Sequence, residues 1–70
     1  MQWKRNPYGT DVLVAVSKDG DIIHEYGKYV HLFDDTHLAI VYTPAPERAV
    51  FPSKKEAQLW IEVTSRLTKT

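Results

Sequence analysis

Residues 12–16 read Val12-Leu13-Val14-Ala15-Val16, a stretch that is apolar at every position and that decides the fold. A strand points alternate side chains to opposite faces of its sheet, so such a stretch needs cover on both faces. Residues 38–42, Leu-Ala-Ile-Val-Tyr, have the same character. One helix can cover only one face of a small sheet. The other face must then be covered by loops of the chain, by closure of the sheet or by a second molecule.

The segments around this stretch predict an antiparallel meander. Asp19-Gly20 favours a tight hairpin turn because glycine accepts positive φ, and Asp34-Asp35-Thr36 predicts a second turn. Gly27 indicates a bulge or bend between two strand segments. We expect strands at residues 12–16, 22–26, 29–33 and 38–42, with a short edge strand at 48–51.

One amphipathic helix is expected after the strands. Ser53 and Glu56 form a capping box, which predicts a helix from Lys54 to about Leu67. Its apolar arc spans roughly 200°, wider than a helix that covers a sheet requires. The arc is formed by Ala57, Leu59, Trp60, Ile61, Val63 and Leu67. Strands followed by a helix predict one α+β domain over residues 1–70, with four to five strands and the helix packed on one face.

Length and composition narrow the function classes. A 70-residue chain buries a small core and is marginally stable. The absence of Cys excludes disulfides and thiolate chemistry. Nine basic and nine acidic residues argue against a non-specific nucleic-acid binder and make association easier. The basic N-terminal residues precede no apolar segment, and no run approaches the roughly 20 apolar residues of a membrane span. We expect a cytoplasmic protein without a membrane partner.

The apolar residues that one helix cannot cover are the main candidates for a binding surface. By parity, Val12, Val14 and Val16 belong with Leu38, Ile40 and Tyr42 on a heavy face, which we assign to the helix. The lighter face and the surplus helix arc are then left for a partner or a second copy. The candidate partner-binding residues are Leu13, Ala15, Ala39, Val41, Leu59 and Val63. The alternative is a curled, barrel-like sheet that buries both sets.

Two charged or aromatic groups are weaker candidates. The helix N-terminus, with Arg48, Ser53, Lys54 and Lys55, is a candidate anion site. The alternative for it is two solvated lysines beside an ordinary cap. Lys28, Tyr29 and His31 resemble a stacking platform for single-stranded nucleic acid. The alternative here is that these aromatic residues belong to the core.

The sequence contains no pattern typical of a metal site or of a catalytic site. His24 and His31 are seven residues apart, so in one unbroken strand they face opposite ways. His37 adds no ligand spacing typical of a metal site. No nucleophile motif, phosphate-binding loop or dinucleotide fingerprint is present. We therefore expect no catalytic residues, no metal site, no cofactor and no enzymatic activity.

These observations favour a small non-enzymatic interaction or regulatory protein that acts by binding another protein, a second copy of itself (a homodimer), or both. A comparison with phage accessory proteins is an analogy of size and character only. The alternative is a nucleic-acid-binding module that uses the aromatic and basic strand with the basic helix N-terminus.

Overall fold

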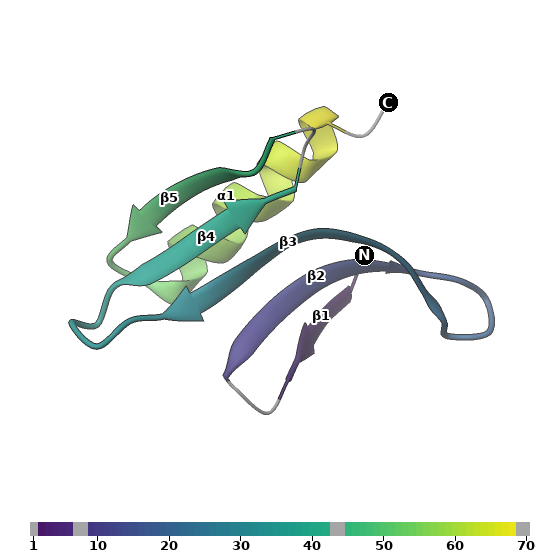
Figure 1. The fold of residues 1–70 in the computed structure, drawn as a ribbon, viewed down its shortest axis with the longest axis horizontal. Helices are drawn as coiled ribbons and strands as arrows, with labels where there is room; N and C mark the ends of the chain where they lie inside the picture. Colours follow the sequence, from purple (N-terminus) through teal and green to yellow (C-terminus); the bar gives the residue numbers. More distant parts are fainter. Residues whose placement is uncertain (1, 7–8, 43–44, 69–70) are drawn as a thin grey trace.

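The computed structural model describes residues 2–6, 9–42 and 45–68, with the backbone alone for 67 and 68. Its elements are β1 (Gln2–Arg5), β2 (Thr10–Val16), β3 (Ile22–His31), β4 (His37–Val41), β5 (Glu47–Phe51) and α1 (Lys54–Thr68). The strands form one antiparallel sheet in the order β1-β2-β3-β4-β5. The helix packs on one face of this sheet (Figure 1). The predicted α+β meander with a C-terminal helix is confirmed.

Two strand predictions differ from the structure. The segments expected at 22–26 and 29–33 form one strand, β3, because the chain passes Gly27 without leaving the sheet. The register between β2 and β3 shifts beside this glycine: Leu13 pairs with Gly27, but Val14 pairs with Glu25. A bulge is therefore present, as expected. Strand β1 was not predicted, since three of its four residues are polar and carry no apolar alternation.

The turns and the helix start follow the local chemistry. Gly20 has φ 88°, and its N–H donates to the Ser17 carbonyl at 3.0 Å, which closes the β2–β3 turn. In the β3–β4 turn the Thr36 hydroxyl donates to Asp34 Oδ1 at 2.6 Å. At the start of α1, Ser53 Oγ accepts the Glu56 backbone N–H at 3.3 Å, as the capping box predicts.

The core lies between α1 and the middle of the sheet. Its fully buried members are Leu13, Tyr29, Ala39 and Val41 from the sheet, with Ala57 and Ile61 from the helix. A Cβ atom on Gly27 would lie 2.5 Å from Ile61 Cγ2 and 2.6 Å from the Ile40 carbonyl oxygen. The helix therefore rests directly on the backbone of β3, and this close approach requires glycine.

The predicted assignment of the two sheet faces is wrong. Leu13, Ala39 and Val41, which we expected on the partner-binding face, are at most 1% exposed and lie under the helix. Ala15 is half-buried and packs against the same core. The physical reason is the close helix approach, which Gly27 and Ala39 allow and which larger side chains would prevent. The heavy face, with Val12, is the one that the helix leaves uncovered.

Candidate protein-binding surfaces

The sheet face turned away from α1 is here called the open face. The register of the strands arranges its side chains in rows across the sheet. The first row is Thr10, Val30, Leu38 and Val50, the second row is Lys4, Val12, Lys28, Ile40 and Arg48, and the third row includes Val14 and Glu25. Paired residues on neighbouring strands share a face, so each row forms a line of side chains across the sheet. The row between the first and the second holds Tyr29 and Ala39, which face the helix.

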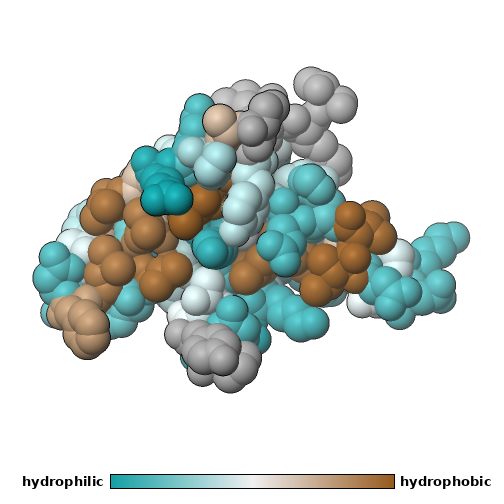
Figure 2. Space-filling model, in the orientation of Figure 1, coloured by the Kyte–Doolittle hydropathy of each residue, from teal (hydrophilic) through white to brown (hydrophobic). Residues whose placement is uncertain are grey.

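The open face carries a contiguous apolar area. Val30, Leu38 and Val50 are directly paired across β3, β4 and β5, and Val50 is 59% exposed. Figure 2 views this face and shows apolar residues gathered in two groups, one of them over β3 to β5. Strands β1 and β5 lie at opposite edges of the sheet. The sheet is therefore not a closed barrel, although Val14 and Ile40 of this face are only 1% and 8% exposed.

Basic side chains alternate with apolar ones in the second row. Lys4, Lys28 and Arg48 lie on β1, β3 and β5, with Val12 and Ile40 between them. Neighbouring strands are about 4.8 Å apart, so each cation stands roughly 10 Å from the next at the backbone. Glu25 is the acidic residue of the third row. The strands thus give the open face an excess of positive charge, although the whole chain has net charge 0.

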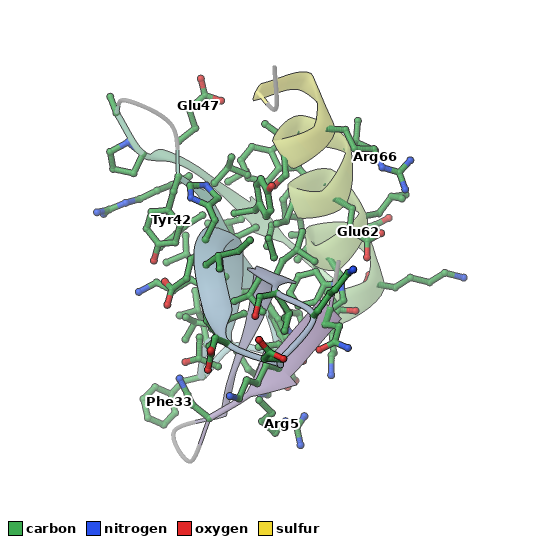
Figure 3. All side chains as sticks on the ribbon, turned by 90° about the vertical axis from the view of Figure 1, so that its right-hand side faces the viewer. Arg5, Phe33, Tyr42, Glu47, Glu62 and Arg66 are labelled. Atoms are coloured by element: carbon green, nitrogen blue, oxygen red, sulfur yellow. The ribbon has the colours of Figure 1, made fainter. Side chains whose placement is uncertain are left out.

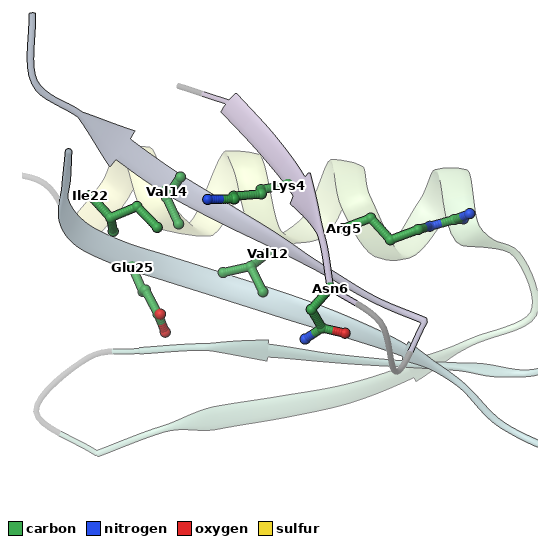
Figure 4. A pocket seen from close by; sticks show the side chains of 7 residues that line it. All are labelled: Lys4, Arg5, Asn6, Val12, Val14, Ile22 and Glu25. Carbon is green, nitrogen blue, oxygen red and sulfur yellow. The ribbon is translucent and has the colours of Figure 1, made fainter. Parts of the chain in front are cut away.

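A shallow groove continues the open face over β1, β2 and the start of β3. Its volume is about 330 Å³, and Lys4, Val12, Val14, Ile22 and Glu25 are among the residues that line it (Figure 4). Ile22 is 47% exposed at the end of the groove, whereas Val14 at its floor is 1% exposed. The groove combines an apolar floor with a lysine and a glutamate, so it suits an apolar side chain better than a reaction centre.

On the helix side, Asp11 connects three elements. Its carboxylate is 8% exposed and accepts hydrogen bonds from Lys54 Nζ at 2.9 Å, Gln58 Nε2 at 3.2 Å and Arg5 Nε at 3.3 Å. Burial alone would raise the pKa of Asp11, but the hydrogen bonds and charges of Lys54 and Arg5 outweigh it and lower the pKa. The hydrogen bond to Asp11 in turn raises the pKa of Lys54. This cluster stabilises the contact of β1 and β2 with the start of α1.

We expect this cluster to make stability depend on pH in acid. A carboxyl group with a lowered pKa in the folded state contributes stability above its unfolded pKa, near 3.8, and loses it as pH falls through the folded value. Asp11→Asn keeps the size of the side chain but removes the titration. Urea unfolding from pH 5 down to pH 2 should therefore show a steeper loss for the wild-type protein than for Asp11→Asn. An equal loss of unfolding free energy with falling pH in both proteins would contradict a stabilising role of the ionised Asp11.

The residues of the candidate anion site are separated in the structure. Lys54 binds Asp11 and lies 5.2 Å from the centre of the Tyr29 ring on the helix side of the sheet. Arg48 belongs to the second row of the open face. Ser53 caps the helix, and Lys55 is exposed. An anion between the helix N-terminus and Arg48 would have to contact both faces of the sheet.

The residues of the predicted nucleic-acid platform lie on different faces of the sheet, and the three histidines do not lie together. Lys28 points to the open face, whereas Tyr29 is 3% exposed under the helix, so the two do not form one platform. His31 and His37 stack with ring centres 4.8 Å apart, and His24 instead contacts Tyr26. Among the described residues, no group of three or more His, Asp or Glu side chains could hold a metal ion.

A second exposed apolar surface lies on α1. Leu59 and Val63 are 59% and 48% exposed, and a groove of about 470 Å³ separates them from Phe51 on β5. Trp60 lies in this groove, its ring centre 5.8 Å from that of Phe51. The apolar arc of the helix predicted the exposure of Leu59 and Val63. The open-face residues were not predicted, because only the register of the strands shows which residues lie together on that face.

Comparisons with protein-family models, with curated proteins and with solved structures give no match. Within the described part of the chain, α1 is too short and too polar to cross a lipid bilayer. The arguments below therefore rest on the geometry and charge of the two surfaces.

Proposed function

We propose that this chain is a non-enzymatic protein-binding module and that its open face docks the partner. The observation that carries the proposal is the row Val30, Leu38 and Val50, which crosses three strands of a sheet whose single described helix lies on the other face. Val50 is 59% exposed, and Val30 and Leu38 are half-buried. Contiguous exposed apolar areas on small proteins mark interaction sites. The face is broad and its groove is shallow, which suits a protein surface better than a small substrate.

The charge of the open face defines the chemistry of the partner. Lys4, Lys28 and Arg48 alternate with Val12 and Ile40 in one row. A complementary surface presents apolar side chains and carboxylates at similar spacing. Such charge pairs raise the association rate and exclude partners of the wrong sign. We therefore expect an acidic protein surface with an apolar centre.

Affinity capture from the cells that make this protein tests the proposal. The double variant Arg48→Glu/Val50→Asp changes two exposed residues of the open face. We expect the wild-type protein to retain a specific protein, and the variant to retain about tenfold less, because a charge pair and an apolar contact are lost together. Mass spectrometry of the eluted proteins measures the difference.

Lys18→Glu is the matched control, because it reverses an exposed charge in the β2–β3 turn, outside the three rows of the open face. It should retain the partner as the wild-type protein does. Equal thermal melting of all three proteins excludes loss of the fold. If nothing is retained, or if the same proteins are retained regardless of the open face, the proposal is wrong. Loss of retention after nuclease treatment would instead assign the basic row to nucleic acid.

A further inference from the structure

The side of α1 that faces away from the sheet carries an ordered seam, here called the outer ridge: Glu56, Leu59, Val63 and Arg66. All four residues are exposed. The buried side of the same helix is formed by Ala57, Ile61 and Ser65. Figure 3 shows Arg66 directed away from the sheet. The outer ridge is therefore a surface of its own, separated from the open face by the thickness of the domain.

The spacing of the outer ridge is that of a helix-packing seam. Its residues follow one another at intervals of three, four and three, so they lie within an arc of about 80°. Packed helix pairs use this alternation of three and four. The two central positions, Leu59 and Val63, are aliphatic, while the two ends carry opposite charges. An exposed helix that only contacts water has no need for aliphatic residues at both central positions.

The order of charges along the outer ridge makes it complementary to itself. Two copies can pack with their helices antiparallel about a twofold axis that crosses the outer ridge at the level of residue 61. Leu59 of one copy then meets Val63 of the other. In the same arrangement Glu56 at one end meets Arg66 of the second copy, and the pair occurs twice. A parallel arrangement would place Glu56 against Glu56. The charges therefore select an antiparallel pair of identical helices.

We propose that the outer ridge binds a second copy of this chain. Leu59 of each copy packs against Val63 of the other and into the groove that Phe51, Trp60 and Val63 line there, in the manner of a ridge in a groove. The resulting dimer has its two helices in the middle and its two sheets outside, so that both open faces remain free. This inference does not depend on the function proposed for the open face.

The size of the contact sets the expected strength. A standard interface buries about 800 Å² on each partner, roughly a sixth of the 5070 Å² surface of this chain. Two short helices, each with one groove beside it, bury less than that. We therefore expect a weak dimer in equilibrium with the monomer.

Sedimentation equilibrium from 10 µM to 1 mM at low salt provides the test, with Glu56→Arg and Arg66→Glu as separate variants. Each variant alone places like charges at both ends of the seam and should weaken association by about tenfold or more. An equimolar mixture should associate as the wild-type protein does, because every Arg then meets a Glu. This recovery also shows that both variants are folded.

A wild-type protein that stays monomeric at 1 mM would overturn the proposal, as would variants that associate with unchanged strength alone. Lys18→Glu is again the control of equal charge change and should leave association unaltered. Self-association that Arg48→Glu/Val50→Asp abolishes, while the Glu56 and Arg66 variants retain it, would move the second copy to the open face. Because the two surfaces are tested by different variants, either proposal can fail while the other stands.

Discussion

Gly27→Ala should lower the free energy of unfolding by about 3 kcal/mol, a large part of the total stability of a chain of this size. The added Cβ would lie 2.6 Å from the backbone oxygen of Ile40 and 2.5 Å from Ile61 Cγ2. Ile61 is fully buried in a helix, where its χ1 has one strongly preferred rotamer, so its methyl group cannot easily move away. The carbonyl oxygen belongs to a paired strand and cannot move without disturbing the sheet. Urea unfolding followed by circular dichroism measures the loss.

Gly20→Ala is the natural comparison for this prediction. Gly20 has φ 88°, but a Cβ atom there meets nothing within 4 Å. The substitution should therefore cost only the strain of a left-handed residue, about 1 kcal/mol. If Gly27→Ala proved no more destabilising than Gly20→Ala, the helix would not rest on the backbone of β3 as described.

Ile61→Ala should cost about 3 kcal/mol, because it removes three carbons from the point where the helix meets the sheet. Ile61 is 0% exposed and belongs to the core cluster with Leu13, Tyr29 and Val41. The neighbouring backbone at Gly27 cannot fill the space, since the strand is held on both sides by its partners. The cavity should therefore remain open, and the melting temperature should fall accordingly.

Leu59→Ala offers a control on the same helix. Leu59 is 59% exposed, so its truncation should change the free energy of unfolding by about 0.5 kcal/mol or less. The same substitution should weaken self-association if the outer ridge binds a second copy. Equal losses of stability for Ile61→Ala and Leu59→Ala would contradict the orientation of α1 on the sheet.

Local signals predicted most of the fold. The Asp19-Gly20 turn, the Asp34-Asp35-Thr36 turn and the Ser53 cap each act through a few neighbouring atoms, and each is found where the sequence placed it. Strand β1 lacks such a signal, because it is ordered by pairing with β2 and by the contact of Trp3 with the helix. Tertiary contacts here override a polar local sequence.

The surfaces were harder to predict, for a geometric reason. Alternation separates two faces within each strand, but it does not say which face a distant helix covers. We gave the helix the side with more aliphatic volume. The deciding factor was close approach, through Gly27 and Ala39, so the lighter face became the core. The row of Lys4, Lys28 and Arg48 depends on the register of all five strands, which no single segment reveals.

The hydrogen bond from Trp3 Nε1 to Glu62, at 2.7 Å, joins residues 59 positions apart in the chain. The β1–β2, β2–β3 and β3–β4 hairpins each close over only a few residues, so all three can form early in folding. The Trp3 bond can form only after the helix has docked. The attachment of β1 to the helix should therefore be among the last contacts to form, and β1, at an edge of the sheet, should be among the first segments to open in the native state. Each opening frees the edge of β2, whose apolar residues 12–16 then form the segment most exposed to aggregation.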